Sequence, residues 1–121
     1  MRSLKTARIS PSAIDETIES LRSSLRLSQE DLARILGVSV RTVVRWEKEG
    51  DQPPPLERER LELIHDVVEI AKDILDAKDI PAWFSNPKES LSGLRPLDIL
   101  STFRGIQKVR DSLEKIRWGI F

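Results

Sequence analysis

Residues 28–48 read SQEDLARILGVSVRTVVRWEK and contain two short helical patterns that meet at a glycine. Ser28 is a favourable N-cap, and Asp31 lies three residues later, where its carboxylate can bond back to the cap. Gly37 can adopt the left-handed conformation that commonly ends a helix, and Ser39 can cap the next one. With only about three residues between them, the two helices must cross steeply. This stretch therefore predicts a helix-turn-helix.

The apolar residues of the same stretch suit such a crossing. Ala33 on the first helix is small enough to let the second helix approach closely. Val43 and Trp46 are expected to face inward from the second helix, which we predict over residues 40–48. Trp46 should therefore anchor this helix to the hydrophobic core.

The stretch resembles the Xre/Cro family of repressors in its pattern S-Q-E-x-L-A-x-x-L-G-V-S…T-V…R-W-E. The resemblance implies DNA binding, with the second helix in the major groove and with Arg41 and Arg45 facing the bases. Arginine suits this task because its planar guanidinium can pair with O6 and N7 of guanine. The DNA-binding residues that the resemblance implies are Gln29, Ser39, Val40, Arg41, Thr42, Val44 and Arg45.

Within this set, Gln29 is expected to donate a hydrogen bond to a phosphate from the start of the first helix. The alternative is that Arg41 and Arg45, which share one helical face, are ordinary solvated side chains. Val40 and Val44 favour a contact surface, because apolar residues beside two arginines on an exposed face can meet thymine methyl groups.

The composition limits the class of protein. The chain has 121 residues, with 20 basic and 20 acidic side chains, one histidine and no cysteine or tyrosine. The absence of cysteine fits a reducing cytoplasm, and no apolar run approaches the roughly 20 residues of a membrane span. His65 has no second histidine and no cysteine near it in the sequence, so we interpret it as structural, and we predict no metal site, no cofactor and no catalytic residues.

The charges are unevenly distributed along the chain. Residues 1–50 carry nine basic and seven acidic side chains, residues 51–77 carry three and eight, and residues 78–121 carry eight and five. An acidic middle thus separates two mildly basic ends, which is compatible with a local phosphate-facing patch.

The remaining segments are also predicted to be helical, and no segment shows sustained strand alternation, so we predict an all-α fold. A first helix should begin at Pro11 or Ser12. Three prolines at 53–55 interrupt the chain before a long helix over residues 56–77. The apolar surface of this long helix is wider than one stripe, so it should pack on two sides, against the DNA-binding bundle and against a second layer or a dimer mate.

The C-terminal segments complete the predicted organisation. A short helix should begin at Pro81 and carry Trp83 on its inner face, followed by helices over residues 96–101 and 104–118. The predicted units are a DNA-binding domain over residues 1–55, a connecting or dimerisation helix over 56–77, and a small helical domain over 78–121.

Residues 83–121 carry a more specific pattern, N-P…L-x-G…P-L-D-x-L…G with a final Gly-Ile-Phe. This pattern resembles the toxin-binding domain of the MbcA/ParS/Xre antitoxins. The resemblance implies a type II antitoxin whose C-terminal domain binds a RES-fold toxin that destroys NAD, and whose helix-turn-helix represses its own operon. The toxin-binding residues that we predict are Trp83, Arg110, Arg117, Trp118, Gly119, Ile120 and Phe121. Of these, Arg110 and Arg117 would steer the approach of the toxin, and the alternative for both is an ordinary solvated helix face.

In the relatives, the C-terminal tail blocks the NAD pocket of the toxin. Here the resemblance implies a plug in which Trp118, Ile120 and Phe121 are apolar anchors, the Phe121 carboxylate is an anion, and Gly119 is a flexible joint. The alternative is a tail that folds back over the helical core.

Two function classes compete with the antitoxin interpretation. One is a stand-alone repressor whose C-terminal half only forms a dimer. The other is an enzyme, which the lack of a general acid–base constellation disfavours. For the antitoxin we expect three partners: a cognate RES-domain toxin, an inverted-repeat operator, and a second copy of the chain in a homodimer.

Overall fold

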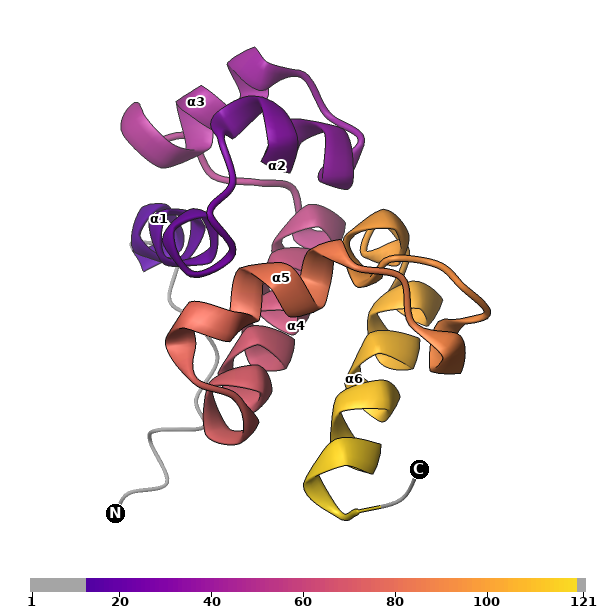
Figure 1. Ribbon diagram of the computed structural model, residues 1–121. Coiled ribbons are helices and arrows are strands. Elements are labelled where there is room, and N and C mark those ends of the chain that lie inside the picture. The colour runs from indigo at the N-terminus through magenta and orange to yellow at the C-terminus, as the bar shows by residue number, and fades with distance from the viewer. Residues whose placement is uncertain (1–12, 120–121) are drawn as a thin grey trace, which may run out of the picture.

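The computed structural model describes residues 13–119, which form α-helices and short 3₁₀ helices without a β-strand (Figure 1). The α-helices are α1 (Ile14–Leu25), α2 (Gln29–Leu36), α3 (Val40–Lys48), α4 (Pro55–Ile74), α5 (Ile80–Ser85) and α6 (Phe103–Arg117). The 3₁₀ helices are η3 (Ala77–Asp79), η4 (Glu89–Leu91) and η5 (Pro96–Ile99). The all-α prediction is confirmed. The predicted start of the first helix, at Pro11 or Ser12, lies outside the described residues.

The turn between α2 and α3 forms through the caps that the sequence predicts. Ser28 Oγ accepts a hydrogen bond from the backbone N–H of Asp31 at 2.9 Å, and Asp31 Oδ2 accepts one from the backbone N–H of Ser28 at 3.0 Å. Ser39 Oγ accepts from the backbone N–H of Thr42 at 3.0 Å. Gly37 ends α2 with φ at 74°, a left-handed conformation that glycine adopts without strain.

The long helix α4 lies at the centre of the molecule, with α1 packed against it on one side and α6 on the other (Figure 1). The prediction that this helix packs on two sides is therefore confirmed. The helix ends at Ile74, however, and not at Ala77 as predicted. Leu75 takes an extended conformation with φ −119° and ψ 153°, which turns the chain and lets α5 pack back against the core.

The prediction for the short helix α5 is partly wrong. The helix begins at Ile80, and its buried ring belongs to Phe84, which has an exposed fraction of 0%, whereas Trp83 is only half-buried. Ile80 and Phe84 are four residues apart and therefore share the inner face, which leaves Trp83 at the edge of that face. The two rings meet edge to face, with centroids 5.0 Å apart and an interplanar angle of 76°.

Two further boundaries differ from the prediction. The segment expected to be a helix over residues 96–101 is the short 3₁₀ helix η5, which ends at Ile99. Helix α6 begins at Phe103, and not at residue 104, because Thr102 caps it: Thr102 Oγ1 accepts from the backbone N–H of Gly105 at 3.0 Å. It ends at Arg117, one residue before the predicted end.

Gly105 marks the closest approach between η5 and α6. A Cβ atom built at this glycine would overlap the backbone carbonyl of Ile99. The glycine is therefore required by packing, since any side chain would push the two segments apart.

One hydrophobic core runs through the described residues, from Ile14 of α1 to Leu113 of α6. Helix α5 contacts α1, and η5 contacts α2, so the N-terminal and C-terminal halves pack against each other. The domain boundaries at residues 55 and 77 stay predictions. Within residues 13–119, no helix is both long and apolar enough to span a bilayer.

Candidate DNA interface and C-terminal surface

Helix α3 has one buried and one exposed face. Val43 and Trp46 are buried, with exposed fractions of 0% and 5%, as the sequence predicts. Arg41 and Arg45 are exposed, and Val40 beside them has an exposed fraction of 37%. The residues predicted to contact DNA from α3 therefore do lie on its solvent face, although Thr42 and Val44 are half-buried.

A nearly buried carboxylate fixes the orientation of α3. Arg22 Nη1 of α1 donates to Glu47 Oε1 at 2.9 Å and to Glu47 Oε2 at 2.8 Å. Gln29 Nε2, at the start of α2, donates to Glu47 Oε1 at 3.0 Å. Glu47 thus connects all three helices of the N-terminal bundle, α1, α2 and α3. The amide of Gln29 bonds within the protein, and its predicted phosphate contact stays a prediction.

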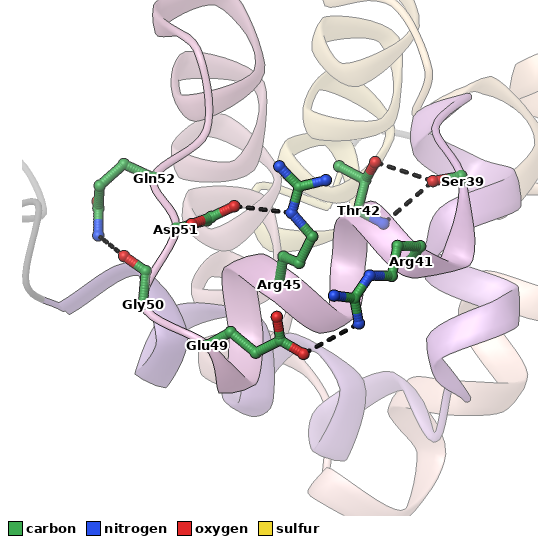
Figure 2. A network of polar contacts seen from close by, with 8 residues as sticks. All are labelled: Ser39, Arg41, Thr42, Arg45, Glu49, Gly50, Asp51 and Gln52. Carbon is green, nitrogen blue, oxygen red and sulfur yellow. Dashed lines mark hydrogen bonds and ion pairs between the residues drawn. The ribbon is translucent and has the colours of Figure 1, made fainter.

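The N-terminal end of α3 is held by Ser39 and Thr42. Besides the backbone cap, their hydroxyl oxygens lie 2.8 Å apart and share a hydrogen bond (Figure 2). Both residues therefore stabilise the first turn of α3.

Both arginines of α3 bond to acidic residues that directly follow the helix (Figure 2). Arg41 Nη1 lies 3.1 Å from Glu49 Oε2, and Arg45 Nε lies 2.7 Å from Asp51 Oδ2. The sequence analysis missed these partners. The sequence did contain a sign of this pairing. Two carboxylates, two residues apart, follow a helix that carries two arginines on one face.

The C-terminal end of α6 presents an exposed aromatic ring. Trp118 has an exposed fraction of 71%, and Gly119 after it is exposed as well. Trp118 does not fold back over the core, so that alternative is wrong for this residue. Ile120 and Phe121, the other predicted anchors, lie outside the described residues. This end of α6 points away from the end of the molecule formed by α2 and α3 (Figure 1).

The other residues predicted to bind the toxin are dispersed. Arg117 pairs with Asp73 of α4 at 3.5 Å and with Glu114 at 3.6 Å, so it also joins α6 to α4. Arg110 is half-buried and forms no ion pair with any residue between 13 and 119. Trp83 lies on a different helix, α5, and faces the C-terminal part of α6 from there.

Trp83 lines a hollow of about 470 Å³ beside α6, together with Lys88, Lys115 and Ile116. Lys88 Nζ stands 4.7 Å from the centroid of the Trp83 ring, and burial lowers the pKa of this lysine. The sequence analysis missed both lysines, because the hollow forms only when η4 packs near the C-terminal part of α6. In the part of the chain that the structure describes, no three His, Cys, Asp or Glu side chains gather as a metal site would require.

Comparisons with known proteins match two parts of the chain. A helix-turn-helix family model matches residues 18–62, and the model of the antitoxin Xre/MbcA/ParS C-terminal toxin-binding domain matches residues 71–119. A probable mycobacterial cidal antitoxin of Mycobacterium tuberculosis is 31% identical over 107 residues, which are 88% of this chain and 89% of that protein.

The fold is similar to a chain in the crystal structure of the M. tuberculosis MbcT–MbcA toxin–antitoxin complex. The TM-score is 0.73 with 23% sequence identity, over 88% of this chain and 96% of that chain. Because the sequence identity is only 23%, this structural similarity is evidence for the fold alone. Because the 31% identical antitoxin covers most of both sequences and both halves match their family models, the chain belongs to the Xre/MbcA/ParS family of antitoxins.

Proposed function

We propose that this antitoxin binds and blocks a RES-type toxin that degrades NAD, and that it represses its own operon by binding operator DNA as a homodimer. Membership of the antitoxin family supports toxin binding, and the resemblance of residues 83–121 to antitoxins of RES-fold toxins supports the class of toxin. The single structural observation that supports a plugging mechanism is the exposure of Trp118, at 71%, immediately after α6.

A tryptophan at the end of a helix is costly to leave in water and gains most when a partner buries it. Aromatic anchors in desolvated pockets commonly contribute about 2 kcal/mol or more each to binding. An NAD pocket needs apolar walls for the rings of its substrate, so Trp118 is chemically suited to enter it. The predicted anchors Ile120 and Phe121 follow in the sequence and would extend the same apolar plug.

The exposed face of α3 supports the DNA-binding half of the proposal. Two arginines flanked by valines suit base edges in a major groove. A homodimer of this kind reads an inverted repeat with half-sites about one helical turn apart. Since α3 and the end of α6 lie at opposite ends of the molecule, one protomer has room for toxin and DNA at once (Figure 1).

The test is NAD consumption by the purified toxin encoded beside this antitoxin. We would compare full-length antitoxin, Trp118→Ala, a variant lacking residues 119–121, and the control Phe103→Ala. Phe103 is an exposed aromatic residue at the other end of α6, with an exposed fraction of 40%. Thermal melts verify that each variant is folded.

We expect Trp118→Ala and the truncation each to weaken inhibition by about 30-fold or more, the effect of losing one such anchor, while Phe103→Ala inhibits like the wild type. Equal inhibition by all four proteins would overturn the plug. A different outcome would support the alternative function. If none of the four proteins inhibits the toxin and Trp118→Ala breaks the homodimer, the chain acts as a stand-alone repressor whose C-terminal half forms the dimer.

A further inference from the structure

The two arginines on α3 are held by their acidic partners through different atoms. Arg45 donates through Nε, the nitrogen nearest the chain, so its two terminal nitrogens form no hydrogen bond with any described residue (Figure 2). Arg41 donates through Nη1, one of its two terminal nitrogens. The end-on fork, which consists of Nη1 and Nη2, is therefore free in Arg45 and partly occupied in Arg41.

Asp51 is itself fixed relative to Arg45 by the backbone. The N–H of Asp51 donates to the carbonyl oxygen of Arg45 at 3.1 Å, and the N–H of Glu49 donates to the same oxygen at 3.1 Å. Gly50 between them has φ at 82°, which permits this tight reversal. Arg45 is thus bonded to Asp51 through both its carbonyl oxygen and its guanidinium Nε, which restrains the side chain while its fork stays unbonded to any described residue.

Arg41 has a different geometry. It lies in the first turn of α3, whereas Glu49 caps the other end of the helix, so the two residues are about 12 Å apart along the helix axis at 1.5 Å per residue. The guanidinium of Arg41 reaches Glu49 only when its side chain lies along the helix surface. To insert its fork into a groove beside α3, Arg41 must first leave Glu49.

We propose that Asp51 is a positioning residue that preorganises Arg45 for reading a guanine, and that Glu49 competes with DNA for Arg41. This inference rests on the proposed DNA binding by α3. Both pairs are solvent-exposed, with side-chain exposures of 48% and 47% for Arg45 and Asp51 and of 67% and 43% for Arg41 and Glu49. Exposed pairs add little to folding stability, so each carboxylate can be neutralised without unfolding the protein.

The two neutralised variants should behave in opposite ways. Asp51→Asn replaces the charged acceptor that orients the fork by a weaker neutral amide oxygen, so the fork is held less firmly and specific recognition should weaken. Glu49→Gln frees Arg41, so affinity should rise. Simple loss of one negative charge near DNA predicts instead that both variants bind more tightly to any sequence. The direction of the Asp51→Asn effect therefore separates positioning from general electrostatics.

The probes are a duplex selected from a random pool by the wild-type protein and a shuffled duplex of equal length and composition. Binding of both probes is measured for the wild type, Asp51→Asn, Glu49→Gln and the charge control Glu30→Gln. Glu30 is exposed in the first turn of α2 and pairs with no described residue. Thermal melts of all four proteins show that the fold is retained.

For Asp51→Asn we expect the ratio of the affinity for the selected duplex to that for the shuffled duplex to fall about fivefold or more. This is the loss of discrimination that one weakened arginine–guanine contact should cause. For Glu49→Gln we expect tighter binding to the selected duplex than Glu30→Gln shows. If Asp51→Asn keeps the wild-type ratio, or if Glu49→Gln gains no more than Glu30→Gln, the assigned role of that residue is overturned. If no duplex is enriched by the wild type, the proposed DNA binding itself fails, which is a distinct outcome.

Discussion

Arg22 of α1 and Glu47 of α3 form an ion pair in which the carboxylate is nearly buried, with a side-chain exposure of 2% against 27% for the arginine. The guanidinium also reaches the loop after α1, because Arg22 Nε donates to the carbonyl oxygen of Leu27 at 3.1 Å. One side chain thus sets the position of α3 against α1 and of the chain that enters α2.

This pair predicts an asymmetric effect of substitution. Arg22→Met removes the hydrogen-bonded cation of the buried Glu47 carboxylate, leaving only Lys48 Nζ at 3.9 Å, and should lower the free energy of unfolding by about 3 kcal/mol. Combining it with Glu47→Leu should recover most of this loss, because the unpaired charge is gone. Urea denaturation of the single and double variants measures both effects. A double variant no more stable than the single one would show that the pair contributes through its geometry and not through its charge.

The arginines of α3 should be needed for DNA and not for the toxin. Arg41→Ala and Arg45→Ala should each weaken binding to the selected operator by about 1–3 kcal/mol and relax base preference at one position. The toxin should still be inhibited, since the end of α6 lies at the opposite end of the molecule (Figure 1). Mobility shifts and the NAD assay measure the two activities. Unchanged DNA affinity in both variants would remove α3 from the interface, and a loss of inhibition would mean that the two activities share a surface.

Gly105 should tolerate no side chain. Gly105→Ala places a Cβ on the carbonyl of Ile99 and should lower the free energy of unfolding towards the upper end of the usual overpacking cost of about 1–3 kcal/mol. A matched control is Ser101→Ala, at an exposed position in the same connection. Thermal melts compare the two. Equal melting temperatures for Gly105→Ala and the control would mean that η5 and α6 can separate at no cost.

Asp31 should make the stability of the bundle depend on acid. Hydrogen bonds from Ser28 hold the pKa of this carboxyl below the ordinary aspartate value, with a further contribution from Arg34. A lowered folded-state pKa stabilises the protein at pH values above the unfolded pKa of about 3.9, and this contribution is lost as the pH falls through and below that value.

The measurement is the urea midpoint of the wild type and of Asp31→Asn at neutral pH and at pH values of about 5 and 3. The wild type should be the more stable protein at neutral pH, and the difference should shrink towards the lowest pH. A difference that stays constant across this range would show that the charge of Asp31 is irrelevant and that only its shape caps the helix.

The sequence determined the helix-turn-helix, α2 and α3, to within a residue, because its signals act locally. The helix ends are set by Ser28, Gly37 and Ser39, which bond only to residues close to them in the sequence. Such local bonds do not depend on how distant parts of the chain pack. That Val43 and Trp46 face the core follows from the 3.6-residue period of the helix alone. The exposure of Arg41 and Arg45 was predictable for the same reason, because this period places them on the opposite face of α3.

Tertiary structure decided the features that depend on distant contacts. The end of α4 at Ile74 and the burial of Phe84 in place of Trp83 follow from the way α5 docks on the core, which no local propensity encodes. In the sequence Glu47 is indistinguishable from an exposed helix residue. Its burial depends on Arg22, 25 residues earlier, which packs beside it only in the folded chain. The pairing of Arg45 with Asp51 likewise depends on a reversal at Gly50, so only the folded chain shows which atoms of the arginine remain free.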